Sequence, residues 1–502
     1  MDDSVASEKK EERLKRWLND NKNLTILGVV IAATIIRLYY FFITKNQPLW
    51  WDEASYGSLA KNFISHQWDA ADVIIGETKI RPPFFPFLWS IVMRLGVSEV
   101  GARFLFEFIP SVLSVIFVYM IVKEFYSKRT AIIASVIFSV LWIHLFYTAR
   151  LLTDVLVLPF IFASIYYFIK ADKDEFNPRY FALSIFVLAF GTLIRYPSGL
   201  VFLAYPISLL ITRGRSIVLN RSFWLSGIVG GTPILAFFAL NYVRTRNIFP
   251  ALLSKDYAQA VSKEINFSIL NFISVYLTKI FFVFFLIGAL VVLVELILGF
   301  DVIGKNKRLK GHLLLTLAMI IIYGYFIFYI KGAEDRWLLP VSLSMVTFSA
   351  LGLDYLYVKG ERYSKPFVTI VIIAILSVGI YSELTFADSL IKDRKQTFIH
   401  AQQGFEWLKA NTPPGTKIMG TGYEVYGIYY SERDYRSFTE NESDIMAFNP
   451  EYLVIYITQN TLPPYLNDYI QRNQKNLQPV HVLFYDQEQK QPAFIVYKVL
   501  VN

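Results

Sequence analysis

The chain has 502 residues, of which 55% are hydrophobic and 18% are charged. Soluble domains carry about 25% charged residues, and here the apolar residues occur in long blocks. This composition excludes a disordered chain, a secreted disulfide scaffold and an ordinary soluble enzyme, and it indicates a polytopic membrane protein. Cysteine is absent, which excludes disulfides, thiol nucleophiles and Cys-based metal sites.

The positive charge is distributed unevenly. The chain carries a net charge of +9, but residues 386–502 hold 11 Lys and Arg against 13 Asp and Glu, so the excess lies in the remainder. Cytoplasmic loops of membrane proteins collect Lys and Arg. We therefore attribute the excess to topology in a lipid bilayer and expect no nucleic-acid partner.

Apolar runs predict about 11 transmembrane helices, since a span needs about 20 residues. Residues 1–23 are polar and basic, and no small-residue cleavage site follows run 24–43, so we expect a cytoplasmic N-terminal segment and an uncleaved first span. The later runs are 102–122, 130–148, 151–169, 180–194, 198–212, 222–242, 269–298, 312–331, 337–357 and 365–385.

Basic residues follow every second run, which supports this count. They gather at 123–129, 170–179, 213–221, 305–310 and 359–365, as cytoplasmic loops should. An odd number of spans places the tail on the extracytoplasmic side. We therefore predict an all-α transmembrane domain over 24–385, with a first outer loop at 44–101.

Segment 83–96 (PFFPFLWSIVMRLG) is too short to cross comfortably and begins among prolines. Counting it as a span would invert every later loop, so we predict an interfacial or re-entrant segment.

The tail, 386–502, has the pattern of a small extracytoplasmic α/β domain. An amphipathic helix is predicted over 388–410 and another over 463–475. Short β-type runs follow the turn at 412–415 (TPPG). These runs are 417–421, 452–458, 481–485 and 493–500.

Two acidic residues at the outer membrane depth are candidate catalytic groups. Asp52 opens the first outer loop within residues 50–54 (WWDEA), and Asp154 lies at the start of run 151–169. An ionised carboxylate facing a cleft can take a proton from a hydroxyl. The structural alternatives are a helix cap for Asp52 and an i, i+4 pair with Arg150 for Asp154.

Four cations at the same depth oppose the inside bias of positive charge. These residues are Lys79, Arg81, Arg195 and Arg336. Arg binds phosphate bidentately and Lys binds it as a point charge, so each is a candidate ligand for a lipid phosphate. The alternative is snorkelling or ion pairing, for example of Arg336 with Glu334 or Asp335.

Other polar residues give weaker signals. The five histidines lack metal-ligand spacing, and His144 has the setting of a core histidine. Arg37, inside the first run, has the position of a snorkelling or cavity-lining residue. A divalent cation held by Asp52, Glu53 and Asp154 stays open as an alternative.

Taken together, the short motifs resemble the glycosyltransferase C superfamily, in particular the branch of dolichyl-phosphate-mannose protein mannosyltransferases and the aminoarabinose lipid A transferase. The resemblance covers about residues 24–360. The motifs are residues 50–54 (WWDEA), Lys79 with 81–83 (RPP), Arg150 with Asp154, 195–197 (RYP) and 336–340 (RWLLP). Arg195 stands where the branch more often has Lys.

The resemblance implies a membrane enzyme that uses a polyprenyl-phosphate sugar and has no obligatory metal or other cofactor. Asp52 would be the base or its partner, Asp154 the second acid, and Lys79 or Arg81 the phosphate ligand. Trp51 and Glu53 depart from some members, which leaves open whether Asp52 or Glu53 is the functional carboxylate.

We expect a mannosyltransferase-like enzyme in the cell membrane that moves a sugar to a hydroxyl of protein, lipid or glycan with inversion. The phosphate leaves while nearby cations, including Arg195 and Arg336, stabilise its charge. An oligosaccharyltransferase is the nearest alternative, although its WWDYG motif lies in the soluble tail. A transporter of lipid-linked sugars predicts repeats and mid-membrane charges, which the sequence lacks.

Overall fold

The computed structural model describes residues 21–65, 81–148, 150–249, 265–457, 462–485, 488 and 490–500. The chain forms two compact units. The first comprises Met1–Lys45, Lys79–Phe85 and Ser98–Lys392, and the second comprises Asn46–Thr78, Pro86–Val97 and Asp393–Asn502. Much of the first outer loop therefore groups with the C-terminal region, whereas the sequence analysis placed all of 44–101 in the transmembrane domain.

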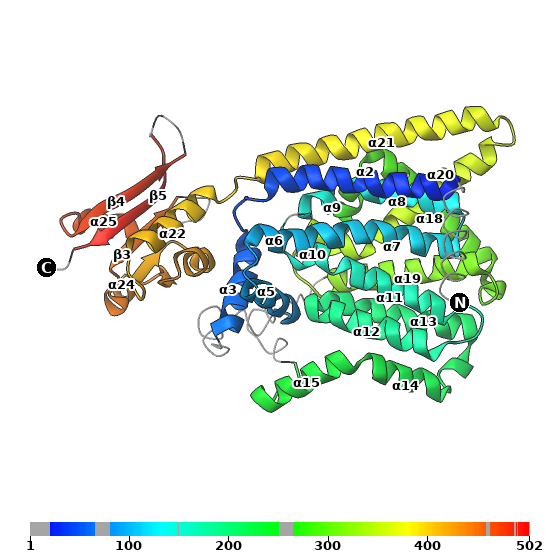
Figure 1. Cartoon of the computed structure of the whole chain (residues 1–502), viewed down its shortest axis with the longest axis horizontal. Coiled ribbons are helices and arrows are strands. Elements are labelled where there is room, and N and C mark those ends of the chain that lie inside the picture. The colour runs from blue at the N-terminus through cyan, green and yellow to red at the C-terminus, as the bar shows by residue number, and fades with distance from the viewer. Residues whose placement is uncertain are drawn as a thin grey trace, which may run out of the picture. The chain divides into compact units, whose positions relative to one another are not determined.

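The first unit is a bundle of long apolar helices together with shorter helices (Figure 1). Its described elements are α2 (Asn21–Thr44), α6 (Glu99–Arg103), the π-helix η1 (Phe104–Phe108), α7 (Ile109–Phe125), α8 (Lys128–Val140), α9 (Trp142–Tyr147), α10 (Thr153–Leu156), α11 (Leu158–Ala171), α12 (Pro178–Ile194), η2 (Tyr196–Leu200), α13 (Val201–Arg213), η3 (Arg215–Ile217), α14 (Arg221–Gly230), α15 (Thr232–Thr245), η5 (Phe267–Leu270), α17 (Asn271–Tyr276), α18 (Lys279–Leu298), η6 (Phe300–Val302), α19 (Lys307–Phe328), η7 (Asp335–Val341), α20 (Ser342–Gly360) and α21 (Lys365–Arg394).

All eleven predicted runs contain helix, which confirms the predicted fold class. In the described part of the chain, seven helices are long and apolar enough to cross a membrane, or eight if α14 and α15, bent by 59°, form one span. Run 130–148 is divided at Leu141, and run 269–298 is divided at Leu277. These divisions shorten the helices, and they occur at the end of the bundle that carries Asp154.

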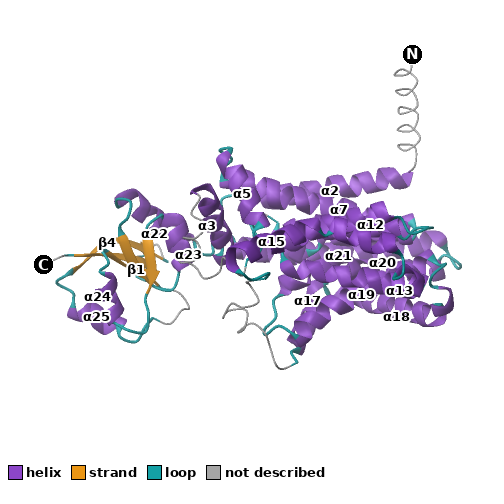
Figure 2. Cartoon of the chain, turned by 90° about the horizontal axis from the view of Figure 1, so that it is seen from below, coloured by secondary structure: helices purple, strands orange, loops and turns teal. Residues whose placement is uncertain are grey.

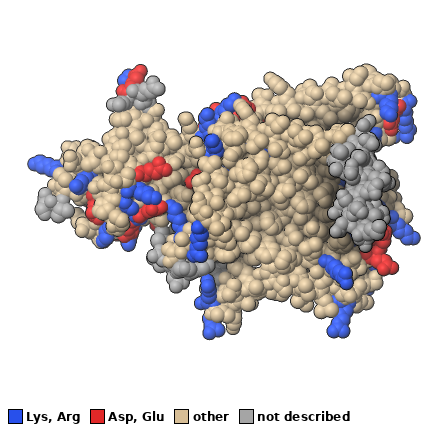
Figure 3. Space-filling model, viewed as in Figure 1, with Lys and Arg blue, Asp and Glu red and all other residues tan. Residues whose placement is uncertain are grey.

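The helices of the bundle differ in how much apolar surface they expose. Helix α18 presents large apolar side chains outward, among them Leu286, Leu290 and Leu293, while α20 is buried along most of its length. In the space-filling view, charge gathers toward the ends of the bundle and leaves a broad uncharged band between (Figure 3). A bilayer is the solvent that suits such a band.

Segment 83–96 folds as α5 (Phe84–Arg94), a helix of 11 residues. At 1.5 Å per residue it is about 16 Å long, roughly half of the hydrocarbon thickness of a bilayer. This length suits the interfacial or re-entrant placement, which stays a prediction.

The second unit contains a mixed five-stranded sheet with the order β2-β1-β3-β5-β4, flanked by helices (Figure 2). Strands β2, β1 and β3 are parallel, and β5 runs antiparallel to β3 and β4. The elements are α3 (Trp51–Ser65), most of α5, α22 (Ile399–Asn411), β1 (Lys417–Gly420), α23 (Glu424–Tyr426), the π-helix η8 (Gly427–Ser431), β2 (Asp434–Ser437), α24 (Ser443–Phe448), β3 (Tyr452–Tyr456), α25 (Leu466–Arg472), β4 (Leu477–Phe484) and β5 (Pro492–Val499).

The sequence predicted four of these strands and missed β2. Strand β2 has four residues, DYRS, of which only Tyr435 is apolar, so no alternating pattern marks it. The predicted helix 388–410 is also wrong as one element, because α21 continues to Arg394 and α22 begins anew at Ile399.

Both faces of the sheet are covered. Met419 and Leu453 belong to a buried cluster with Ile445 and Phe448 of α24. On α22, Phe405 makes an edge-on contact with Phe494 of β5, their ring centroids 5.1 Å apart. The tail therefore has its own hydrophobic core, as an α/β domain requires.

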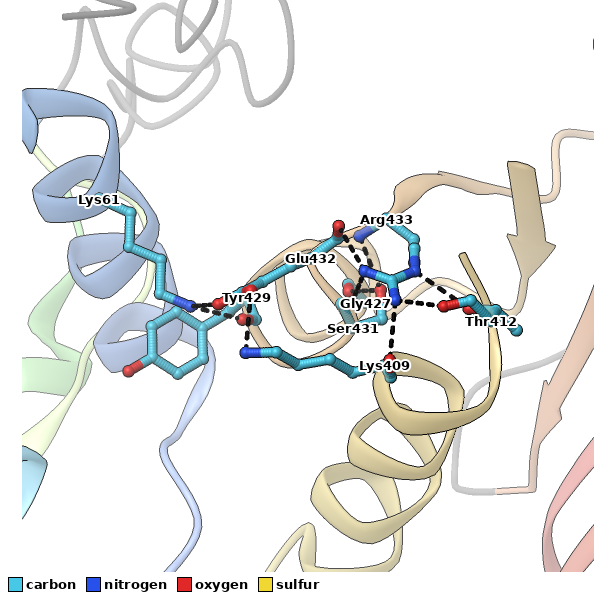
Figure 4. A network of polar contacts seen from close by, with 8 residues as sticks. All are labelled: Lys61, Lys409, Thr412, Gly427, Tyr429, Ser431, Glu432 and Arg433. Carbon is cyan, nitrogen blue, oxygen red and sulfur yellow. Dashed lines mark hydrogen bonds and ion pairs between the residues drawn. The ribbon is translucent and has the colours of Figure 1, made fainter. Parts of the chain in front are cut away.

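An ion-pair network joins helix α3 of the first outer loop to the C-terminal region (Figure 4). Lys61 Nζ lies 2.7 Å from Glu432 Oε1 and donates to the Tyr429 carbonyl at 2.9 Å, while Lys409 Nζ lies 2.8 Å from Glu432 Oε2. Burial alone would raise the pKa of Glu432, but Lys409 and Lys61 bring that pKa below its ordinary value. Helix α3 and the α/β elements thus form one packed unit.

Candidate functional site

The first unit holds a buried carboxylate between two guanidinium groups. Arg195 Nη1 lies 2.7 Å from Asp154 Oδ1, and Arg336 Nη1 lies 3.9 Å from Asp154 Oδ2. The Asp154 side chain is only 1% exposed, and the two Arg side chains are partly exposed. Three of the seven predicted site residues therefore come together. Such an arrangement presents positive charge beside an anchoring acid.

Breaks in the helices place these three residues. Asp154 lies in the short helix α10, Arg195 ends α12 before the Pro-containing turn η2, and Arg336 lies in η7. Because each break exposes backbone and side chains at the helix end, the site can form there. Arg336 also pairs with Glu334, with Nε and Oε2 2.5 Å apart, so the ion-pair interpretation of this residue is confirmed as well.

Tyr147 and Asp335 extend the cluster; the sequence analysis considered Asp335 only as an ion-pair partner of Arg336 and assigned Tyr147 no role. The Tyr147 hydroxyl donates to Asp335 Oδ1 at 3.0 Å, and the Arg336 backbone N–H donates to the same oxygen at 2.6 Å. These bonds fix η7 against α9. The sequence feature that could have pointed to Asp335 is its position beside Arg336. No sequence feature distinguishes Tyr147 from the other tyrosines, of which the chain has 32 in all.

Glu383, on α21, is a second residue that the sequence analysis missed. Its side chain is fully buried, and its carboxylate accepts the backbone N–H groups of Trp142 at 3.0 Å and Thr278 at 2.9 Å. It therefore caps the first residue of α9, the helix that carries Tyr147. It also binds the N–H group of Thr278, the residue just before α18. A lone acid inside the apolar run 365–385 was the available signal, because such residues are costly within membranes.

Arg37 is fully buried inside the bundle and does not snorkel. Its guanidinium donates to Ser111 Oγ at 2.6 Å and to the carbonyls of Ser139 at 2.9 Å and Ala33 at 3.1 Å, and it lies 2.9 Å from His144 Nδ1. This network joins α2, α7, α8 and α9. His144 is thus a core histidine, as its sequence setting indicated.

A large apolar cavity of about 810 Å³ lies in the same unit. It is lined mainly by α12, η2, α13, α14 and α15, with Phe181 and Phe223 among its aromatic residues. Tyr196, next to Arg195 in the chain, is also a lining residue, and its ring lies 4.9 Å from that of Phe249. An apolar space of this size suits an apolar chain.

Asp52 and Glu53, both in the second unit, differ in burial and in their contacts. Glu53 is fully buried, and its Oε2 accepts the backbone N–H of Trp50 at 2.6 Å. A Glu in the third helical position that reaches back to the N-cap N–H is half of a capping box. Asp52 lies in the first turn of α3 and is partly exposed. Glu53 therefore has a structural role, and Asp52 is the better candidate base.

The remaining predicted contacts stay predictions. Asp52 and Asp154 belong to different units. Lys79 lies outside the described residues, and Arg81 is partly exposed just before α5. In the described residues, no three His or acidic side chains are grouped as metal ligands.

We compared the chain with models of protein families and with curated proteins. Residues 80–240 match the family model of dolichyl-phosphate-mannose-protein mannosyltransferase. No curated protein matches the chain.

Solved structures of low sequence identity share the fold. ArnT from Cupriavidus metallidurans, bound to undecaprenyl phosphate, aligns over 93% of this chain and 98% of its own, with a TM-score of 0.59 and 12% identity. An oligosaccharyltransferase from Archaeoglobus fulgidus aligns over 97% and 75%, with a TM-score of 0.63 and 13% identity. The arabinofuranosyltransferase AftD from Mycobacteria aligns over 94% and 40%, with a TM-score of 0.59 and 14% identity.

The chain therefore has the fold of the glycosyltransferase C membrane enzymes. The resemblance predicted from its short motifs is confirmed, with a sequence match to the mannosyltransferase family model over residues 80–240.

Proposed function

We propose that this protein is an integral membrane glycosyltransferase that moves a sugar from a polyprenyl-phosphate donor to an acceptor hydroxyl, with inversion at the anomeric carbon. The observation that carries the proposal is the buried Asp154 between Arg195 and Arg336. Tyr196, the residue after Arg195, lines the apolar cavity. This combination supports a donor that has an anionic head and an apolar chain.

The donor follows from that pairing of chemistries. A polyprenyl chain fills an apolar cavity, and Arg binds phosphate with parallel N–H bonds. In the similar structures, ArnT is bound to undecaprenyl phosphate, and AglB from Archaeoglobus fulgidus is in complex with a dolichol-phosphate. Lys79 and Arg81 are proposed as further phosphate ligands.

In the proposed reaction, Asp52 takes the proton of the acceptor hydroxyl while the oxygen of that hydroxyl attacks the anomeric carbon. The new C–O bond forms as the bond between that carbon and the phosphate oxygen breaks, through an oxocarbenium-like state. Arg195 and Arg336 stabilise the negative charge of the leaving phosphate, and Asp154 holds both guanidinium groups in place. One displacement inverts the configuration.

The finer assignments extend this proposal. We propose a mannosyltransferase-like donor preference, in line with the matched family model. We also propose that the protein lies in the cell membrane with its N-terminus in the cytoplasm and its α/β domain outside, in line with the pattern of basic loops.

The test is incubation of purified protein with a panel of polyprenyl-phosphate sugars and a mixed set of hydroxyl acceptors, scored by release of free lipid phosphate. Asp52→Asn should lower kcat by about 10³-fold, because a positioned base contributes about 10² to 10⁴. The matched control, Glu53→Gln, should lower the melting temperature more than it lowers turnover. Release of no lipid phosphate from any donor, or near-normal turnover of Asp52→Asn, would contradict the proposal.

A further inference from the structure

We infer that a small polar cavity at the other end of the bundle from Asp154 is a second binding site, which takes the phosphate group of an anionic ligand. This inference goes beyond the proposed function and does not depend on it. It is drawn from the cavity itself, from the excess of lysines around it and from the contacts that hold its walls in place.

The cavity has a volume of about 190 Å³. Asp154 precedes helix α11, and Asp172, which lines the cavity, follows that helix, so the two acids lie at its opposite ends. Drug-sized ligands occupy about 300–1,000 Å³. The cavity is therefore too small for a nucleotide or a sugar chain and suits one small polar group, such as phosphate.

Positive charge exceeds negative charge around this cavity. Lys170 Nζ lies 2.7 Å from Glu124 Oε1, and Arg213 pairs with Asp172, so both cations bind acids of the cavity wall. With the lysines and acids that line the cavity, they make six cations and three acids, a net charge of +3, and such a cleft concentrates anions. The lining members are Lys173, Lys305, Lys307, Lys310, Glu124, Asp172 and Asp174.

Ion pairs and close packing hold the walls of the cavity in place. Lys310 Nζ lies 3.0 Å from Asp172 Oδ2 and donates to the Asp172 carbonyl at 3.1 Å, while Arg213 binds the other carboxylate oxygen. Gly304 packs so closely on the end of α13 that an added Cβ would lie 2.3 Å from the Thr212 carbonyl oxygen. The cavity is thus a built feature of the bundle.

Three of the lining lysines are left for a ligand. Lys173 and Lys305 are exposed, and neither makes an ion pair with any residue that the structure describes. Lys307 Nζ is 3.9 Å from Glu124 Oε2, and its side chain is 59% exposed. Lys307 also begins α19, whose first turn has no acid, although a helix N-terminus favours negative charge. A bound phosphate would supply that charge.

A phosphate group reaches this end of the bundle on an anionic phospholipid or as a soluble anion. The cytoplasmic leaflet carries anionic lipids, and the pattern of basic loops predicts that this end faces the cytoplasm. Apolar side chains, among them Phe125 and Leu314, also line the cavity. They favour the phosphate of a phospholipid, whose acyl chains are apolar.

The experiment uses the full-length protein in detergent micelles and two probes, phosphatidylglycerol and inorganic phosphate. Their Kd values are measured by native mass spectrometry and by calorimetry, at one ionic strength because salt screens such attractions. Each single change, Lys173→Gln, Lys305→Gln or Lys307→Gln, should raise Kd about 5-fold, since one lysine near a lipid surface contributes about 1 kcal/mol. The triple variant should raise it about 100-fold.

The matched control is the triple variant Lys359→Gln, Arg362→Gln and Lys365→Gln. It removes three exposed cations from another basic loop that is predicted to be cytoplasmic. Its Kd for both probes should equal that of the parent, because those residues do not line the cavity.

Asp174→Asn tests the site in the opposite direction. Asp174 lines the cavity, is exposed and has no cation partner in the described part of the chain. Loss of its negative charge should tighten binding about 3-fold, since charges near a protein surface interact weakly. A change that merely disturbs the fold would not tighten binding.

The two probes distinguish the sources of phosphate. A loss of phosphatidylglycerol binding in the first triple variant assigns the site to a lipid head group, and a loss confined to inorganic phosphate assigns it to a soluble anion. Equal Kd values for the parent and that variant with both probes, an equal loss in the control, or no binding of either probe by the parent would overturn the inference.

Discussion

The two ends of the helical bundle carry similar ion pairs in different surroundings. At one end, Asp154 lies between Arg195 and Arg336, and Tyr196, the residue after Arg195, lines an apolar cavity of about 810 Å³. At the other end, Asp172 pairs with Arg213 and, at 3.0 Å, with Lys310, beside a small polar cavity of about 190 Å³. A buried acid with two cations therefore does not by itself mark a functional site, and our proposal for the Asp154 end rests also on the apolar cavity lined by Tyr196.

The helix ends differ as well. At the Asp172 end, α8, α12, α14 and α19 begin with local caps, in which the side chains of Ser127, Asn177, Asn220 and Asn306 accept nearby backbone N–H groups. At the Asp154 end, the N–H groups of Trp142 and Thr278 are bound by Glu383, 241 and 105 residues away in the chain. These four helix starts are therefore capped by neighbouring residues, and the starts of α9 and α18 by a residue far away in the chain.

The largest effect within this comparison should come from Arg195→Ala. It removes the closest cation to Asp154 and should lower kcat/KM by about 10²-fold, as loss of one group that stabilises developing charge does. Arg213→Ala, the matched change at the other end, should reduce thermal stability and leave donor affinity unchanged. Equal catalytic losses in the two purified variants would remove the functional distinction between the ends.

Glu383→Gln should lower the free energy of unfolding by about 2 kcal/mol, because one backbone N–H loses its charged acceptor in a buried setting. It should also lower turnover, since α9 carries Tyr147. Asn306→Ala removes a local cap and should cost about 1 kcal/mol with normal turnover. Thermal melts and kcat of both variants check this, and normal turnover in Glu383→Gln would show that the distant cap is only structural.

Gly227→Leu should raise the KM for a long-chain donor about 10-fold and leave a short-chain donor unaffected. Gly227 lines the apolar cavity, and a Cβ added there has no atom within 4 Å, so the side chain fills lipid space without a backbone clash. Gly28→Leu on α2, equally free of neighbours, is the control. An unchanged donor KM in Gly227→Leu would place the lipid elsewhere.

The smallest effect should come from Glu432→Gln, which weakens the contact of Lys61 on α3 with the α/β region by less than about 1 kcal/mol, since both side chains are partly exposed to solvent. Because the folded pKa of Glu432 is lowered, its contribution is present at neutral pH and is lost as pH falls through the folded pKa. Melting curves of parent and variant should converge on acidification. A difference that persists at low pH would refute this role.

Much of the fold could be predicted from sequence, and less of the site. Apolar runs predicted the long helices of the bundle, because length and hydropathy are local properties. Asp154, Arg195 and Arg336 were identified by their unusual depth and charge, yet their mutual contact was not predictable, since they are far apart in the chain. Glu53 illustrates the limit: only its bond to the Trp50 N–H assigns it to helix capping rather than catalysis.

By itself, the sequence determined that this is a multi-pass membrane protein with a small α/β tail, because burial in lipid demands long apolar helices with local hydrogen bonds. The tertiary structure decided which charges meet, where the helices break and that α3 packs with the C-terminal region. Those choices depend on contacts between segments hundreds of residues apart, and no local pattern encodes them.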